Sequence, residues 1–294
     1  MTAPVRRLTT LDEATRAEVE ALAERIERAD RVAPLNEAAL ISLRPPTTHE
    51  TTHLVADGPA GPIGYANLQR LGTALTAQMV VDPTARRTGV GTALLAAARL
   101  PADSGVWSFG DLPPARAFAA ARGLIADREL LMMATELPDA EVGTTPRTPA
   151  DLQIRPYGPA DETAVLRINA RAFAHHPEQG AMDAAEFAAR RAQQWYRDED
   201  LLVATRADLA VGFHWTKRHD AETGEVYVLA VDPDAQGGGI GTALLLAGLA
   251  HLRAAGIRRV ILYVAGDQPV AVHLYRSHGF EVTHRDVMYV PATG

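Results

Sequence analysis

Two distant stretches of this chain share one pattern, and the repetition limits the architectures open to it. Residues 81–97 read Val-Asp-Pro-Thr-Ala-Arg-Arg-Thr-Gly-Val-Gly-Thr-Ala-Leu-Leu-Ala-Ala. Residues 231–247 read Val-Asp-Pro-Asp-Ala-Gln-Gly-Gly-Gly-Ile-Gly-Thr-Ala-Leu-Leu-Leu-Ala, so the two align without a gap. A repeat of this kind is one supersecondary unit used twice. We therefore predict a tandem duplication: a first domain over 1–140, a Pro/Thr-rich linker over 141–151 and a second domain over 152–294.

Each copy has the composition of a strand, a glycine turn and a helix. An apolar run ends at Asp-Pro, glycines follow, and an Ala/Leu-rich stretch comes next. Glycine adopts positive φ without strain, and the following helix directs unpaired N–H groups and the positive end of its dipole at the turn. This combination predicts a cradle for a diphosphate. The plainer interpretation is a loop that only turns a strand into a helix.

The spacing of the glycines narrows the choice of ligand. It matches neither G-x-G-x-x-G with a later acidic residue nor G-x-x-x-x-G-K-[ST]. Gln236-x-x-Gly239-x-Gly241 and Arg86-x-x-Gly89-x-Gly91 instead resemble the Q/R-x-x-G-x-G/A motif of the GCN5-related N-acetyltransferases (GNATs), which holds the pyrophosphate of acetyl-CoA. The resemblance implies an α/β (α+β) fold: two tandem GNAT-like domains, each a mixed, mostly antiparallel sheet flanked by helices.

The two halves also repeat one order of elements. In the first half we predict strands at 5–8, on both sides of a turn at 59–62, and at 74–81, 106–109 and 130–136, with helices at 11–28, 36–44 (N-cap Asn36) and 113–122. In the second half we predict strands at 152–155, 201–205, 209–215, 225–231, 259–264 and 282–290, with helices at 161–173, 183–196, 240–254 and 269–278.

Acetyl transfer from a thioester to an amine needs a proton acceptor, a donor to the carbonyl oxygen and an acid for the thiolate. Glu225 opens the strand before the second cradle and is the candidate base; Tyr275, on a later helix, is the candidate acid. A backbone N–H near residues 229–231 would polarise the carbonyl if a bulge frees it. The alternatives are an exposed charge at a strand edge for Glu225 and core packing for Tyr275.

The duplication supplies an internal control for these two residues. The position equivalent to Glu225 in the first half is Leu75, and the position equivalent to Tyr275 is Ala119. The first half therefore keeps a cradle and lacks both proton-transfer groups. We interpret it as a copy that binds acetyl-CoA or is purely structural.

Composition excludes several other classes. A net charge of −7 argues against nucleic acid, and the lack of cysteine removes disulfides, thiolate metal sites and a cysteine nucleophile. His175, His176, His273, His278 and His284 fit no metal spacing, so no metal is expected. The N-terminus lacks the apolar core of a signal peptide, and no run is long enough to span a membrane. We expect a cytoplasmic monomer that acts on a small molecule, without nucleic-acid or membrane partners.

A closer resemblance covers essentially the whole chain. Residues 175–180 (His-His-Pro-Glu-Gln-Gly), 212–217 (Gly-Phe-His-Trp-Thr-Lys), 224–227 (Gly-Glu-Val-Tyr) and 262–264 (Leu-Tyr-Val) resemble the mycothiol synthases, tandem acetyltransferases of actinobacteria with an inactive first half. That family acetylates the cysteinyl amine of Cys-GlcN-Ins (desacetylmycothiol), the last step of mycothiol biosynthesis. The excess of Arg over Lys, with Lys217 as the sole lysine, is consistent with a GC-rich source.

The resemblance also implies particular contacts. Substrate contacts are implied at Glu37, Glu178, Lys217, Glu225 and Tyr263. Acetyl-CoA contacts of the second half are implied at Leu229, Ala230, Val231, Gln236, Gly237, Gly238, Gly239, Ile240, Gly241, Thr242, Gln268, Pro269, Val270, Ala271, Val272 and His273. A second cofactor site in the first half is implied at Met79, Val80, Val81, Arg87, Thr88, Gly89, Val90, Gly91 and Thr92. Gln268 stands where the family usually has Asn.

Two other functions stay open on the sequence. The cradle and Tyr275 do not identify the acceptor, so the amine of an aminoglycoside or a polyamine is an alternative. A non-catalytic acetyl-CoA sensor is the second, because the first half already lacks the proton-transfer pair.

Overall fold

The structure is a computed structural model that describes residues 4–45, 47, 50–71, 74–102, 104–138, 149–174 and 182–292. The chain forms two compact units. Unit 1 comprises Met1–Leu130 and His284–Gly294, and unit 2 comprises Leu131–Thr283. Residues 141–148 of the predicted linker lie outside the described residues. The division of the chain into 1–140, 141–151 and 152–294 stays a prediction about the sequence repeat.

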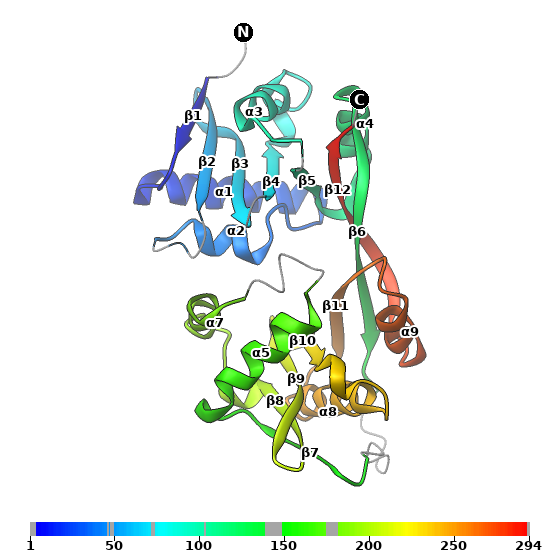
Figure 1. Cartoon of the computed structure of the whole chain (residues 1–294). Coiled ribbons are helices and arrows are strands. Elements are labelled where there is room, and N and C mark those ends of the chain that lie inside the picture. Colours follow the sequence, from blue (N-terminus) through cyan, green and yellow to red (C-terminus); the bar gives the residue numbers. More distant parts are fainter. Residues whose placement is uncertain are drawn as a thin grey trace. The chain divides into compact units, whose positions relative to one another are not determined.

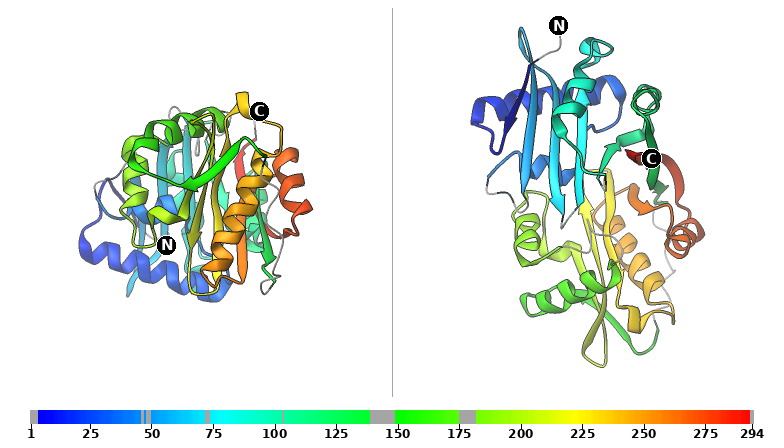
Figure 2. Two further views of the ribbon diagram at one scale, coloured as in Figure 1. Left: turned by 90° about the horizontal axis from the view of Figure 1, so that it is seen from below. Right: turned by 45° about the horizontal axis from the view of Figure 1, so that its top comes forward.

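Unit 1 is a mixed sheet with helices on both faces. Its elements are β1 (Val5–Leu8), α1 (Glu13–Asp30), α2 (Glu37–Ser42), β2 (Thr51–Gly58), β3 (Gly61–Leu71), β4 (Ala74–Val81), α3 (Val90–Ala98), β5 (Gly105–Ser108), α4 (Pro113–Ala121), the first part of β6 (Leu124–Glu136) and most of β12 (Glu281–Pro291). The strand order is β1-β2-β3-β4-β5-β12, antiparallel except for the parallel β4–β5 pair. Figure 2 shows β2, β3 and β4 side by side.

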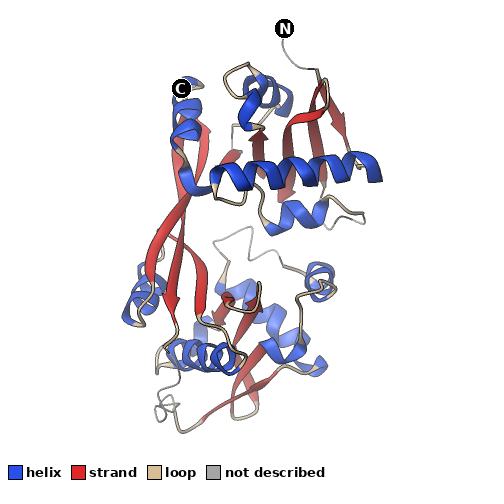
Figure 3. Ribbon diagram, turned by 180° about the vertical axis from the view of Figure 1, so that it is seen from behind, coloured by secondary structure: helices blue, strands red, loops and turns tan. Residues whose placement is uncertain are grey.

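The apolar spacing of α1 fixes which face of the sheet it covers. Val19, Leu22, Ala23 and Ile26 recur at helical spacing and pack with α2 and the sheet in one cluster. The Asp12 carboxylate accepts the Thr15 N–H at 2.7 Å and starts the helix. Figure 3 shows α1 crossing the strands of unit 1, whereas α3 packs in a separate cluster on the opposite face.

Unit 2 repeats this plan. Its elements are the end of β6, β7 (Leu152–Pro156), α5 (Glu162–Ala172), α7 (Ala184–Arg191), β8 (Leu201–Arg206), β9 (Leu209–Arg218), β10 (Thr223–Val231), α8 (Ile240–Ala254), β11 (Arg259–Ala265), α9 (Pro269–Ser277) and the start of β12. The strand order is β6-β11-β10-β9-β8-β7, with β10–β11 parallel and β7–β8–β9–β10 antiparallel (Figure 1). The predicted α/β architecture with mixed sheets is confirmed.

Two cores hold the faces of the unit 2 sheet. Phe187 of α7 and Trp215 of β9 belong to an aromatic-rich cluster that α5 shares, and their rings meet edge to face at 5.3 Å. On the other face, Leu249 of α8 and Tyr275 of α9 share a cluster with β6, β10 and β11. The cradle helix and the helix of the candidate acid therefore pack on the same face.

One predicted helix is shorter than expected. The sequence predicted a helix from Asp183 through Trp195 and Tyr196, but α7 ends at Arg191. Trp195 and Tyr196 both pack against Trp215, with ring centroids 5.8 and 5.6 Å away. Neighbouring residues on a helix point in different directions, so a continued helix would bring only one of them to Trp215.

Candidate active site

The second cradle is an open loop at the start of α8. Gly237, Gly238 and Gly239 all have positive φ, at 90°, 60° and 80°. A Cβ on Gly237 or Gly239 would meet nothing within 4 Å, so the backbone conformation and not crowding requires glycine there. Gly239 is the N-cap of α8 and provides no side-chain cap, which leaves the first N–H groups of the helix available. These features fit a diphosphate.

The first cradle has the same outline with other side chains. Gly89, with φ of 96°, is the N-cap of α3, again without a side-chain cap. Arg87 stands at the position of Gly237 and is held at a φ of 67°, a costly conformation for a residue with a Cβ. Arg86 is turned to Asp30, with ion-pair contacts at 2.9 and 2.6 Å, and to the Val81 carbonyl at 3.2 Å.

The aspartate that precedes each cradle is fixed by an arginine from the first helix of its unit. Arg167 of α5 forms an ion pair with Asp232, and Arg25 of α1 contacts Asp82 at 3.1 Å. Burial by itself would raise the pKa of Asp232, but hydrogen bonds from the Asp234 N–H and from Arg167 lower it overall. The carboxylates therefore stay ionised and brace the turn between strand and cradle.

A β-bulge alters β10 next to the cradle. Val226 pairs with Thr216 and Val228 with Trp215, so Tyr227 is the extra residue of the bulge. The parallel pairing of β10 with β11 ends at Val226, and residues 228–231 are paired only with β9. The polar groups of the free side of this stretch are where the sequence predicted a donor to the thioester carbonyl, although the bulge comes before residues 229–231.

The equivalent strand of unit 1 lacks the bulge. β3 and β4 pair without a register shift from Gly64↔Val81 to Leu71↔Ala74. The pairing of β4 with β5 ends at Gln78, so residues 79–81 also leave the neighbouring strand. Both units thus open beside their cradle, but only the β10 strand changes the direction of its side chains there.

Glu225 is buried and has a defined partner. Its side chain is 9% exposed, and Oε2 lies 2.7 Å from Nε2 of His219. Across the sheet it pairs with Lys217 on β9 and with Ile261 on β11. Its burial excludes the alternative of an exposed charge at a strand edge.

Lys217 is also buried, against aromatic faces. Its Nζ lies 4.5 Å from the ring centre of Trp195 and 5.1 Å from that of Tyr227. A desolvated ammonium gains from such cation–π contacts. Arg190 of α7 lies 5.6 Å above the same Tyr227 ring. Glu225 and Lys217 are therefore buried neighbours on adjacent strands.

Sequence reasoning did not single out His219, Trp195 or Tyr227 as members of this site. A signal for His219 was present, because residues 215, 217 and 219 of an extended strand share one face. The position of Trp195 depends on the early end of α7, which local sequence did not indicate.

Tyr275 packs in the core and has the protonation state of an acid. It is 7% exposed, and its ring meets Phe280 edge to face at 5.8 Å. Burial raises its pKa to about 12, so the phenol keeps its proton at neutral pH. The phenol makes no hydrogen bond to any of the described residues. Packing and acid catalysis are therefore compatible here.

Several of the remaining predicted residues of unit 2 are more exposed. Tyr263 on β11 is 43% exposed and Val270 83%. Gln268 is the N-cap of α9 without a side-chain hydrogen bond to the helix, and His273 lies on its solvent side. Gly241 lies against Leu274 of α9, at 3.7 Å from the position of a Cβ, which links the cradle helix to α9.

Two predicted contacts fall elsewhere. Glu178 lies outside the described residues. Glu37 is the first residue of α2 in unit 1, where the Asn36 side chain accepts the Ala39 N–H at 2.9 Å, as the predicted N-cap requires. Leu75 and Ala119, the counterparts of Glu225 and Tyr275, are both buried apolar residues of unit 1.

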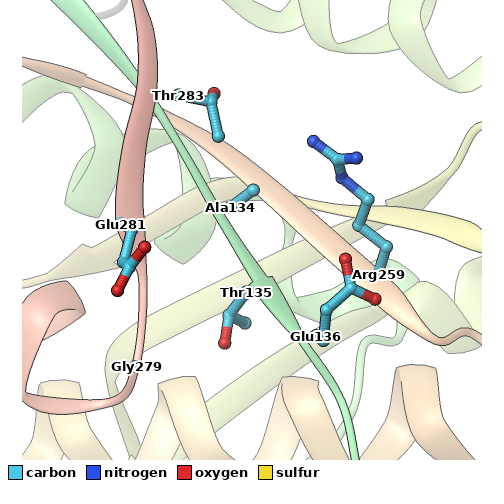
Figure 4. Close-up of a pocket in the computed structure, with 7 residues that line it drawn as sticks. All are labelled: Ala134, Thr135, Glu136, Arg259, Gly279, Glu281 and Thr283. Atoms are coloured by element: carbon cyan, nitrogen blue, oxygen red, sulfur yellow. The ribbon is translucent and has the colours of Figure 1, made fainter.

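A cavity of about 340 Å³ in unit 2 lies outside this group. It is lined by Ala134, Thr135, Glu136, Arg259, Gly279, Glu281 and Thr283 (Figure 4). None of the predicted site residues lines it. Within the described part of the chain, no three His, Asp or Glu residues are grouped as a metal site would require, and no helix has the length and hydropathy to cross a membrane.

Family models match both halves. Residues 165–280 match the model described as "Acetyltransferase (GNAT) family", and residues 49–123 match "Acetyltransferase (GNAT) domain". Together with the two cradles, these matches define the class: the protein is a tandem GNAT, an acetyl-CoA-dependent N-acetyltransferase.

Relatives that align over the whole chain identify the family within this class. The mycothiol acetyltransferase of Actinosynnema mirum is 44% identical over 292 residues, covering 95% of this chain and 96% of the relative. That of Rhodococcus jostii is 42% identical over 295 residues, covering 96% of each. The chain belongs to the mycothiol acetyltransferase family.

Solved structures confirm the tandem fold. A tandem GNAT protein from the clavulanic acid biosynthesis pathway has a TM-score of 0.72 at 21% identity, over 97% of this chain and 98% of the other. A GCN5-related N-acetyltransferase from Sphaerobacter thermophilus has a TM-score of 0.70 at 23% identity, over 98% and 96%.

Proposed function

We propose that unit 2 transfers the acetyl group of acetyl-CoA to the cysteinyl amine of Cys-GlcN-Ins, the last step of mycothiol biosynthesis. The names of the relatives support this acceptor. The observation that carries the assignment of chemistry to unit 2 is the bulge at Tyr227 in β10. It follows the buried Glu225, and the open cradle comes directly after the same strand.

The residues of unit 2 divide the chemistry among them. Glu225 accepts the proton that the amine loses as nitrogen attacks the carbonyl carbon. Backbone N–H groups on the free side of residues 227–231 donate to the carbonyl oxygen as it gains negative charge. Tyr275 gives its phenolic proton to the departing thiolate, and the cradle keeps the thioester in place by holding the diphosphate.

The polar residues suit a polyhydroxylated acceptor. Lys217 and Tyr263 provide donors in unit 2, and Glu37 and Glu178 are carboxylates able to accept from hydroxyl groups. A site that relies on hydrogen bonds to hydroxyls discriminates strongly against analogues that lack them. The aromatic packing of Lys217 limits its motion, which favours a fixed hydrogen-bonding role.

The acceptor assignment is tested by turnover with a panel of amines. Purified protein is given acetyl-CoA with Cys-GlcN-Ins, an aminoglycoside or a polyamine, and thiol release is followed. We expect kcat/KM to be highest with Cys-GlcN-Ins. A higher value with another amine would assign that acceptor instead, and no thiol release with any amine would refute catalysis.

The proposal includes one acetyl-CoA per unit, with turnover only in unit 2. Both cradles offer an uncapped helix N-terminus, at Gly89 and at Gly239. Calorimetric titration should give two sites in the wild type, and Gly239→Ala and Gly89→Ala should each weaken one of them because alanine strains a left-handed backbone. A single site that Gly89→Ala leaves unchanged would remove the cofactor from unit 1.

The protein acts in this proposal as a cytoplasmic monomer.

A further inference from the structure

We propose that His219 is a positioning residue for Glu225: its Nε2–H donates to Oε2, which fixes the carboxylate and leaves Oε1 as the oxygen that accepts the amine proton. The inference rests on the proposed role of Glu225 as the base. Nothing in the family match or in the names of the relatives addresses His219.

The contact itself sets the direction of the hydrogen bond. Nε2 and Oε2 are 2.7 Å apart. A carboxylate can only accept, so the nitrogen that faces it carries the hydrogen. Among the described residues, Oε1 of Glu225 has no hydrogen-bond donor. The two oxygens are therefore distinct, one held by the imidazole and one left for the reaction.

The backbone around His219 is rigid enough to hold that geometry. The His219 N–H donates to the Thr223 carbonyl at 2.9 Å. In the same turn, Oδ1 of Asp220 accepts the N–H groups of Glu222 and Thr223, both at 2.7 Å. The imidazole thus projects from a closed hairpin turn, and not from a loose loop.

Register brings the ring over the carboxylate. Glu225 pairs directly with Lys217, and His219 is two residues further along β9 and the turn, so it is the diagonal neighbour on the same face. The His219 side chain is 36% exposed and that of Glu225 is 9% exposed. The imidazole covers the base on the side of the hairpin turn.

Among the residues that the structure describes, few charged groups surround Glu225. Lys217 and His219 face it from β9 and its turn, and its partner Ile261 on β11 is uncharged. Asp220 lies in the turn beside His219, and Arg259 begins β11 opposite Thr223. Of these, His219 contacts the carboxylate directly, which makes it the residue that sets its orientation.

Two substitutions of His219 separate the effect of its hydrogen bond from the effect of its ring volume. His219→Gln keeps an N–H donor at about the reach of Nε2, whereas His219→Phe keeps the ring shape without a donor. We expect His219→Phe to lower kcat about 10- to 100-fold, the range for a lost hydrogen bond to a charged group. His219→Gln should stay within about threefold of the wild type.

Other readouts do not depend on turnover. Acetyl-CoA affinity should be unchanged in His219→Phe, which controls for folding. Nitrogen NMR of the His219 ring in the free protein should report the Nε2–H tautomer when the ring is neutral. The Nδ1–H tautomer, full activity in His219→Phe, or equal loss in His219→Gln and His219→Phe would each overturn the proposal.

The test also distinguishes this inference from the function on which it rests. Glu225→Gln should lose activity, and adding His219→Phe to it should cause no further loss. If Glu225→Gln keeps full activity, the base assignment fails. If only Glu225→Gln is impaired, the base assignment stands and the role of His219 is refuted.

Discussion

Replacing Gly248 with alanine should destabilise unit 2 through a single buried histidine. Gly248 lies within α8, and the His214 ring of β9 occupies the space that a side chain would need. A Cβ on Gly248 would be 2.1 Å from both Cε1 and Nδ1 of His214. His214 is fully buried, so its ring has no solvent to move into.

The cost follows from the contacts of His214. Its Nδ1 donates to the Leu244 carbonyl at 2.8 Å, and its Nε2 has no partner among the described residues. Displacing the ring breaks the Nδ1 hydrogen bond and leaves that N–H buried without a partner, worth about 1–3 kcal/mol, and overpacking adds about 1–3 kcal/mol. Alanine regains about 1 kcal/mol of helix propensity. We expect a net loss of about 3 kcal/mol.

Chemical denaturation followed by tryptophan fluorescence measures this loss, since Trp195 and Trp215 both lie in unit 2. Gly241→Ala is the matched control in the same helix. Its Cβ would make only ordinary contacts, 3.7 Å from Leu274 and 3.9 Å from Val231. The control should show no comparable loss of stability.

A double variant tests the mechanism directly. His214→Ala alone should destabilise by opening a cavity, but it should make room for the alanine at 248. The two substitutions together should therefore cost about 2 kcal/mol less than the sum of their separate effects. Additive effects, or a Gly248→Ala variant as stable as the wild type, would show that the ring does not exclude a side chain at this position.

Two further predictions concern pH and turnover. Burial lowers the pKa of His214 to about 4, against an ordinary value of 6.5. Between these two pH values the histidine is protonated in the unfolded chain and neutral in the native state, so protons favour unfolding. The free energy of unfolding should fall as the pH drops from 6.5 to 4, and His214 alone should account for about 2 kcal/mol of this loss at pH 5. A urea midpoint that stays the same between pH 7 and 5, or an equal fall in His214→Ala, would contradict this. Tyr275→Phe should lower kcat about 100-fold while acetyl-CoA affinity stays near wild type, because the phenol makes no hydrogen bond to the described residues; a loss of affinity in calorimetry would make Tyr275 structural.

The sequence was informative where a signal depends on near neighbours. Asn36 was predicted as an N-cap because a side chain and an N–H three residues apart meet in any helix start, and the structure confirms it. The strands predicted at 201–205 and 209–215 leave three residues between them, enough for a hairpin turn, and Ala207 and Asp208 adopt positive φ there. The cradles belong to this group, since their shape depends on glycine backbone and on the helix that follows.

The features that the sequence did not predict depend on contacts between residues far apart in the chain. The helix after Asp183 was predicted too long. Trp195 and Tyr196 both pack against Trp215, which is distant in the sequence, and this packing is incompatible with a continued helix. The role of His219 depends on the register of β9 against β10, and register is a sum of many cross-strand contacts.

By itself, the sequence determined a duplicated strand–cradle–helix unit with a carboxylate and a phenol in one copy only, because repeats and local backbone preferences are written in consecutive residues. Only the tertiary structure decided that β10 bulges at Tyr227, that His219 holds Glu225, and that His214 requires glycine at 248. These features come from residues that meet after the chain folds, where burial and packing select one partner among many.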